Sequence, residues 1–102
     1  MIDDAMKNHA LRFSLEWGPE MGKPLLGKMR TIYPKIDEET VKQLDKLCSE
    51  IKSFAWRRYE EAFSKEISEG EAGRLIREQY PFVDPGNLSQ LHTQGMYYAW
   101  HG

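Results

Sequence analysis

The sequence predicts an all-α fold of about five helices packed around one long central helix in a bundle-like arrangement. Apolar residues recur at three- and four-residue steps over the longest helical pattern, roughly residues 37–67. Proline and glycine interrupt this periodicity at a few separated places, which divides the rest of the chain into shorter helices. No stretch alternates apolar and polar residues between two turns. We therefore expect helices and no sheet.

Two shorter helices are expected before the central one. The first begins at Asp3 or Asp4, either of which can accept a hydrogen bond as the N-cap, and continues to about Trp17. Gly18 and Pro19 end it, and Pro19 is suited to open a second helix that continues to Tyr33. The apolar face of the first helix consists of Ile2, Met6, Ala10, Phe13 and Trp17.

The central helix has a start signal and a wide apolar side. Asp37 is placed as its N-cap, and carboxylates in the first turn favour the positive end of the helix dipole. At about 1.5 Å per residue the helix would be about 45 Å long, whereas a compact domain of this size is about 26 Å across. Part of it must therefore project, bend or be covered by a second chain. Seven apolar residues fall in one narrow sector: Val41, Leu44, Cys48, Ile51, Ala55, Tyr59 and Ala62.

Two helices are expected after the central one. Ser68 and Glu71 have the spacing of a capping box, which starts a fourth helix that continues to about Tyr80. After a turn rich in proline and glycine, Asn87 and Gln90 have the same spacing and start a fifth helix. Glycine within that last helix, at position 95, would allow a neighbouring helix to approach closely.

A short motif occurs twice. Residues 30–37 (Arg-Thr-Ile-Tyr-Pro-Lys-Ile-Asp) align with residues 77–84 (Arg-Glu-Gln-Tyr-Pro-Phe-Val-Asp), 47 positions later. The sequence thus predicts two similar corners, each a helix, a Tyr-Pro turn and another helix. Either a helix-turn-helix unit is duplicated, or this is simply suitable chemistry for ending one helix and starting the next. The first corner resembles the Met-Phe-Pro corner of the CUE ubiquitin-binding module. The long helix after it departs from that module, so no function is transferred.

Size and composition exclude several classes of protein. The 102 residues are expected to form a single domain, 1–102. The composition, with 40% hydrophobic and 29% charged residues, argues against disorder. The net charge of −2 gives no general attraction to nucleic acid or anionic lipid. A single cysteine, Cys48, suits a reducing compartment, so we expect a cytoplasmic protein. No secretory signal and no apolar run of about 20 residues is visible, so no membrane association is expected.

No motif for catalysis, a cofactor or a metal is present, so the prediction leans away from an enzyme and includes no cofactor. His9, His92 and His101 stand in neither a Glu-x-x-His nor a His-Glu-x-x-His pattern. One cysteine cannot form a zinc knuckle, and Cys48 lies in the apolar sector of the central helix, where burial is expected.

One cluster combines basic and aromatic residues: Trp56, Arg57, Arg58 and Tyr59. Such residues contact phosphate and stack on bases in single-stranded nucleic acid complexes. Successive residues on a helix point in different directions, however, so the four should not form one patch. Nucleic acid is therefore a disfavoured partner, and a DNA-binding regulator is the least favoured hypothesis.

The last helix is unusual because no Asp, Glu, Lys or Arg follows Asp84. A surface helix normally has a charged face, so this helix is expected to be covered either by its own chain or by a partner. Tyr, Trp and Met are enriched at protein interfaces. The candidate interface residues are Leu88, Leu91, His92, Met96, Tyr97, Tyr98 and Trp100.

The sequence does not identify a function. The leading hypothesis is a small soluble domain for protein–protein interaction that binds another protein or a second copy of itself. The alternative is a small-molecule-binding or catalytic helical bundle. Its cavity would be lined by Trp17, Trp56, Tyr59, Tyr98 and His92.

Overall fold

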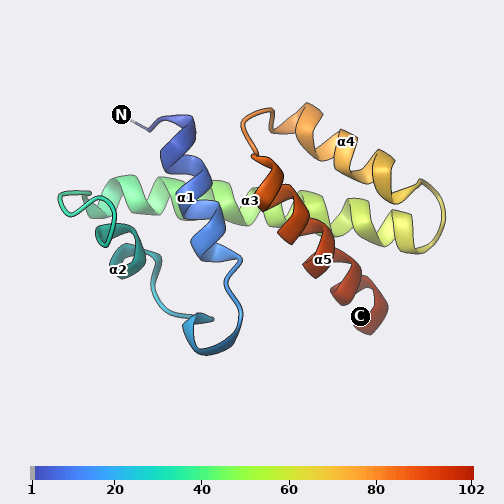
Figure 1. Cartoon of the computed structure of the whole chain (residues 1–102), viewed down its shortest axis with the longest axis horizontal. Coiled ribbons are helices and arrows are strands. Elements are labelled where there is room, and N and C mark those ends of the chain that lie inside the picture. Colours follow the sequence, from blue (N-terminus) through green and yellow to red (C-terminus); the bar gives the residue numbers. More distant parts are fainter. Residues whose placement is uncertain (1) are drawn as a thin grey trace. The chain divides into compact units, whose positions relative to one another are not determined.

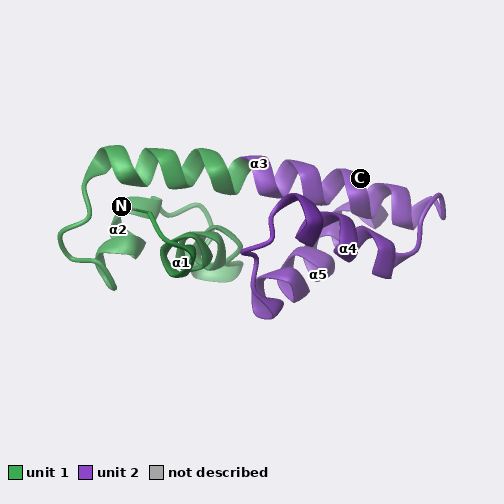
Figure 2. Ribbon diagram, turned by 90° about the horizontal axis from the view of Figure 1, so that it is seen from above, with its two compact units in different colours: residues 1–49 green, residues 50–102 purple. Residues whose placement is uncertain are grey.

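The computed structural model describes residues 2–102, which form five α-helices and one short 3-10 helix without any strand (Figure 1). The all-α prediction is confirmed. The chain divides into two compact units, the N-terminal unit of residues 1–49 and the C-terminal unit of residues 50–102 (Figure 2). The boundary lies within the long helix α3 (Glu38–Phe63), so both units contain part of it. The single-domain assignment of residues 1–102 stays a prediction.

The N-terminal unit begins with α1 (Asp4–Ser14), whose N-cap is Asp3. The Asp3 carboxylate accepts a hydrogen bond of 2.8 Å from the backbone N–H of Met6. The helix ends at Ser14 rather than near Trp17, because the chain takes an extended conformation at Trp17 before the Gly18-Pro19 turn. The buried apolar residues of this unit are Ala10, Leu11, Leu15, Met29, Ile36, Val41, Leu44 and Cys48.

The second predicted helix is interrupted. A 3-10 helix η1 (Gly18–Glu20) is followed by a turn, and α2 occupies only Leu25–Arg30. Gly22 has a φ of 83°, which a right-handed helix cannot contain. Pro24 also disfavours a helical conformation at the residue before it, so the helix restarts only after the proline.

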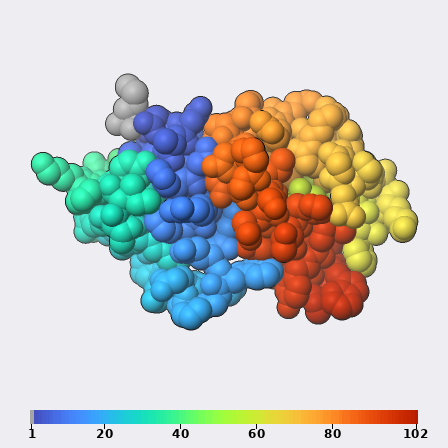
Figure 3. Space-filling model, viewed as in Figure 1, coloured from blue at the N-terminus to red at the C-terminus, as the bar shows by residue number. Residues whose placement is uncertain are grey.

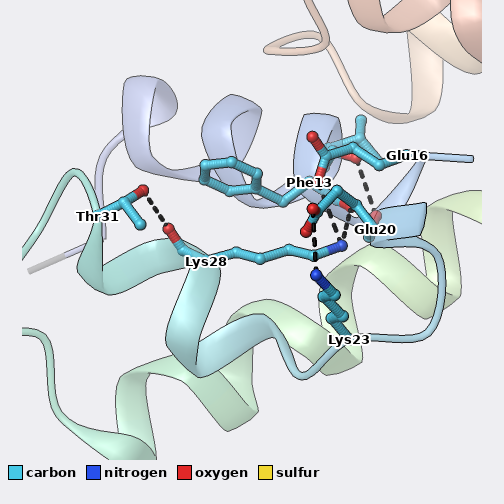
Figure 4. Close-up of polar contacts among 8 residues, drawn as sticks. Phe13, Glu16, Glu20, Lys23, Lys28 and Thr31 are labelled. Carbon is cyan, nitrogen blue, oxygen red and sulfur yellow. Dashed lines mark hydrogen bonds and ion pairs between the residues drawn. The ribbon is translucent and has the colours of Figure 1, made fainter. Parts of the chain in front are cut away.

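Lys28 attaches α2 to the end of α1 (Figure 4). Its ammonium group lies 3.2 Å from the Glu16 carboxylate and donates a hydrogen bond of 3.3 Å to the Phe13 carbonyl oxygen. The Lys28 side chain is only 11% exposed. Hydrogen bonds between charged groups strengthen when solvent is partly excluded, so this contact helps to position α2.

The C-terminal unit combines the second part of α3 with α4 (Glu69–Gln79) and α5 (Pro85–His101). The Ser68 hydroxyl accepts the predicted capping hydrogen bond from the Glu71 N–H at 3.0 Å, whereas the Glu71 carboxylate binds Arg74. The fifth helix begins earlier than predicted. Its N-cap is Asp84 rather than Asn87, and Pro85 is its first residue, where a missing N–H does no harm.

The predicted apolar sector of the central helix is confirmed. All seven of its residues, from Val41 to Ala62, are at most 8% exposed. In the C-terminal unit this sector is joined by Ala72 and Ile76 from α4, and by Leu91 from α5. Burial of such side chains stabilises a fold by about 25 cal/mol for each Å² of apolar surface removed from water.

The central helix ends at Phe63 rather than near Ile67. The N–H of Lys65 donates to the Ala62 carbonyl (3.0 Å), and the N–H of Glu66 donates to the Glu61 carbonyl (2.9 Å). These two hydrogen bonds form a Schellman motif. Lys65 has a φ of 63°, the left-handed conformation that this motif requires and that glycine usually provides.

The first Tyr-Pro corner is held by three hydrogen bonds. The N–H of Tyr33 donates to the carbonyl of Met29 (2.8 Å), and the N–H of Ile36 donates to the carbonyl of Tyr33 (3.1 Å). Asp37 then caps α3 by accepting a hydrogen bond of 2.7 Å from the N–H of Thr40. The corner therefore closes α2 and starts α3 within a few residues.

The second corner repeats these hydrogen bonds at the aligned positions. The N–H of Tyr80 donates to Ile76 (2.8 Å), the N–H of Val83 donates to Tyr80 (3.1 Å), and Asp84 accepts from Asn87 (2.8 Å). The two predicted corners are thus confirmed. Each unit consists of a helix, a second helix, a Tyr-Pro corner and a third helix. The structure thus repeats the corner, and the duplication of a whole unit stays a prediction.

Candidate functional site

The predicted interface residues of α5 differ widely in exposure. Leu91 is fully buried, Leu88 and Met96 are partly buried, and His92 is exposed. The three large aromatic residues near the end of the helix are all exposed: Tyr97 (47%), Tyr98 (37%) and Trp100 (70%). The first part of α5 therefore contributes to the core of its own unit, whereas the last part leaves its aromatic side chains accessible.

The exposed aromatic residues of α5 contact one another. The His101 ring lies 4.2 Å from that of Tyr97 and 4.4 Å from that of Trp100, measured between ring centroids. Tyr98 packs against Tyr97 at 5.6 Å and against Trp56 of α3 at 5.5 Å. We call Tyr97, Tyr98, Trp100 and His101 the aromatic face. Figure 3 shows the end of α5, in red, at the molecular surface.

Tyr59 of α3 lies beneath α5. It is 1% exposed, and burial raises the pKa of its phenol to about 12, with the negative charge of Glu69 as a second cause. A Cβ atom placed on Gly95 would lie only 2.5 Å from Cδ2 of Tyr59. The absence of a side chain at Gly95 therefore permits the close approach of α5 that the sequence predicted.

A groove of about 510 Å³ lies between α4 and α5 in the C-terminal unit. Within it, the His92 ring stacks on Tyr59, with centroids 5.2 Å apart and planes inclined by 16°. His92 Nε2 also contacts the carboxylate of Glu69 at the start of α4. We call this groove the α4–α5 groove. It is lined by Tyr59, Glu69, Gly70, Gly73, Arg74, Arg77, Pro85, Leu88, Ser89 and His92.

The groove differs from the cavity that the sequence suggested. Of the five residues expected to line that cavity, only Tyr59 and His92 line the groove. Trp56 and Tyr98 pack against each other instead, and Trp17 lies in the N-terminal unit. Sequence reasoning did not identify Gly70, Gly73 or Arg77 as lining residues. The sequence feature that could have indicated this groove is a pair of glycines three positions apart within a predicted helix.

The basic and aromatic cluster on α3 does not form one surface. Tyr59 is buried, and Trp56 is partly covered and contacts Tyr98. The Arg58 guanidinium donates a hydrogen bond of 3.0 Å to Glu61 and lies over the Phe54 ring, 4.9 Å from its centroid. Only Arg57 is exposed. The four side chains therefore lie in different surroundings rather than side by side on one surface.

A second groove, of about 540 Å³, lies at the first corner in the N-terminal unit. Its walls include Met6, Ile32 and Pro34, and Asp37 at its edge is engaged in capping α3. Next to the corner, the Tyr33 hydroxyl lies 2.8 Å from Nδ1 of His9. The hydrogen bond from Thr40 lowers the pKa of the Asp37 carboxyl. These polar groups serve the local structure.

Residues 2–102 contain neither a cluster of metal-binding side chains nor a helix suited to cross a membrane. There, no three histidine, cysteine, aspartate or glutamate side chains lie close enough together to hold a metal ion. None of the helices described for this range combines the length and the apolar character needed to cross a bilayer. Comparison with known protein families, with curated proteins and with solved structures gives no match to this chain.

Proposed function

We propose that this protein is a protein-binding helical domain that self-associates through the aromatic face of α5. The main support is the 70% exposure of Trp100 beside the exposed rings of Tyr97 and Tyr98. Tryptophan and tyrosine are the residues most enriched among those that dominate binding energy at interfaces. A cluster of them at the surface is more typical of a binding surface than of a purely solvated helix.

The absence of charge on α5 favours a second copy as the partner. In an interface with two-fold symmetry, each surface faces a copy of itself, so like charges would be placed opposite one another. No Asp, Glu, Lys or Arg follows Asp84 in the sequence, so this repulsion does not arise. The contacts of His101 with Tyr97 and Trp100 also restrict the rings before binding, which lowers the entropy lost on association.

Sedimentation equilibrium of the full chain and of two matched variants tests this proposal. The wild-type protein should show a mass that rises with concentration, and Trp100→Ser should weaken the association by about tenfold or more. Met21, another exposed apolar residue (58%), lies in the N-terminal unit, so Met21→Ser should leave the association unchanged. A strict monomer at every concentration, or equal effects of both substitutions, would contradict self-association through this face.

We also expect the protein to act in the cytoplasm. Cys48 is the only cysteine of the sequence, and it is buried in the apolar sector of α3. A protein without disulfides suits a reducing compartment. Fractionation of cells that produce the chain with an epitope tag would test this expectation, and recovery from an oxidising compartment would contradict it.

A further inference from the structure

We propose that a second copy of the chain binds across α3 as well as α5, so that the self-association surface continues from the aromatic face to Phe63. This proposal rests on the proposed function and adds a second helix to the same site. The size of the aromatic face, the exposure of Phe63 and the contact that joins α3 to α5 support it.

The aromatic face alone is too small for a stable dimer. A fully buried aromatic side chain removes about 150–250 Å² of surface from water, so the exposed parts of Tyr97, Tyr98 and Trp100 amount to about 300 Å². A stable interface buries about 800 Å² on each partner, of which about 65% is apolar between identical chains. Each copy therefore needs about 500 Å² of apolar surface, and a neighbouring part of the molecule has to provide the rest.

Phe63, the last residue of α3, offers further apolar surface in the same unit. Its side chain is 45% exposed, and it is the one exposed large apolar residue of residues 50–102 outside the aromatic face. The end of the helix does not depend on this ring, because the Schellman motif is closed by the backbone N–H groups of Lys65 and Glu66. Within residues 2–102 the Phe63 ring also packs against no other aromatic ring.

Trp56 connects Phe63 with the aromatic face. Trp56 and Phe63 are seven positions apart on α3, close to two full turns, so both lie on the same face of the helix. Trp56 is partly exposed, and its ring packs against Tyr98 of α5 at 5.5 Å. Figure 1 shows α5 running across the second part of α3. The accessible rings therefore continue from one helix to the other within the C-terminal unit.

The charges beside these rings favour a second copy over a charged partner. The charged residues of α3 that lie three or four positions from Trp56 or Phe63 within the helix are Lys52 and Glu60. Their charges cancel, and no Asp, Glu, Lys or Arg follows Asp84. Lys52 and Glu60 also stand four positions before and after Trp56. Two copies that meet around a two-fold axis near Trp56 can thus place Lys52 of one copy opposite Glu60 of the other.

Sedimentation equilibrium of Phe63→Ser tests whether α3 belongs to the interface. The substitution should weaken the association by about tenfold or more, because every dimer would lose the buried ring twice. Ile32→Ser, at an exposed apolar residue (38%) of the N-terminal unit, is the control and should leave the association unchanged. Far-ultraviolet circular dichroism of both variants shows whether the fold is retained.

A dilution series of the ¹⁵N-labelled wild-type chain examines the same surface without a substitution. As the dimer dissociates, the amide signals of residues 56–63 in α3 should shift over the same concentration range as those of residues 97–101 in α5. The signals around Arg74 of α4, outside the proposed surface, should stay in place. If Phe63→Ser unfolds, this series decides the result.

The outcomes separate this proposal from the proposed function. If Trp100→Ser weakens the association and Phe63→Ser does not, the aromatic face binds the second copy without α3, and the extension to Phe63 is wrong. A dilution series in which only the signals of α5 shift leads to the same conclusion. Equal weakening by Phe63→Ser and Ile32→Ser would also overturn the extension. A chain that stays monomeric at every concentration contradicts both the extension and self-association itself.

Discussion

Tyr59 is the side chain on which the three helices of the C-terminal unit meet. It belongs to α3, its ring stacks on His92 of α5, and its hydroxyl lies 4.0 Å from the place where a Cβ of Gly73 in α4 would stand. A large aromatic residue that is 1% exposed removes much apolar surface from water. Substitutions around this ring should therefore affect the stability of the unit more than substitutions elsewhere on its surface.

Gly95→Ala should destabilise the protein by about 1–3 kcal/mol, although alanine favours helices, because the new methyl group would overlap the Tyr59 ring. Gly73→Ala is the matched control, since the same change on α4 meets only ordinary contacts. It should leave stability unchanged or raise it by up to about 1 kcal/mol. Urea unfolding of both variants measures these differences. Equal effects would show that α5 does not approach α3 at this glycine.

The phenol of Tyr59 should make stability depend on pH in alkaline solution. Its pKa rises from 10.0 to about 12 on folding, so the folded state retains the proton more tightly than the unfolded state. The resulting stability is present in full below pH 10.0 and is lost as the pH rises through about 12. The loss should be about 2–3 kcal/mol, measured as the free energy of unfolding across this range.

Tyr59→Phe removes the ionisable group and retains the ring, so it is the control for this pH dependence. The variant should show a smaller decrease in stability over the same range. The pKa values of Tyr33 and Tyr80 are also raised, mainly by burial, and they affect both proteins equally. If wild type and variant lose stability in parallel, the burial of Tyr59 is not the cause.

At the scale of single elements, the end of α3 depends on an unusual residue. The Schellman motif places Lys65 in the left-handed conformation, which is unfavourable for a residue with a Cβ atom. Lys65→Gly should therefore stabilise the protein by about 0.5–1 kcal/mol. Lys46→Gly, inside the same helix at an exposed position, should instead destabilise it by about 1 kcal/mol. Thermal unfolding measures the stability of both variants. A stability change of the same sign in Lys65→Gly and Lys46→Gly would contradict the assigned helix end.

The N-cap of α5 gives a second prediction at this scale. Asp84→Ala should lower the free energy of unfolding by about 1 kcal/mol, because the N–H of Asn87 loses its acceptor. Asp84→Asn should lower it by only a few tenths of a kcal/mol, since asparagine caps almost as well. Chemical denaturation measures both variants. A loss as large for asparagine as for alanine would mean that the charge of Asp84, rather than its capping hydrogen bond, is what matters.

The starts of α1, α3 and α4 were predicted correctly from the sequence, whereas those of α2 and α5 were not. Asp3, Asp37 and Ser68 form the expected caps, because a cap depends on a side chain and a neighbouring N–H. The end of α3 was placed too late because Lys65 gives no glycine signal. The α4–α5 groove was not predicted either, since it depends on how two helices lie beside each other. Tyr97, Tyr98 and Trp100 of the aromatic face were predicted from the composition of the last helix, whereas His101 joins them only through its ring contacts in the structure. The function of this face stays a prediction.

At the scale of the whole molecule, the long helix is explained by the two units. The sequence suggested that a helix of this length must project, bend or be covered by a second chain. The 26 residues of α3 instead supply one helix to each unit, and its apolar sector is buried from Val41 to Ala62. The length of α3 therefore no longer argues for a dimer, and the case for self-association now depends on the aromatic face of α5.

An isotope-filtered nuclear Overhauser experiment on a mixture of labelled and unlabelled chains tests self-association through the aromatic face of α5 most directly. Only contacts between two different copies give signals in this experiment. Self-association through the aromatic face predicts intermolecular signals between the rings of Tyr97 and Trp100, and their loss in Trp100→Ser. Intermolecular signals confined to other residues, or none at concentrations where the protein is associated, would contradict it.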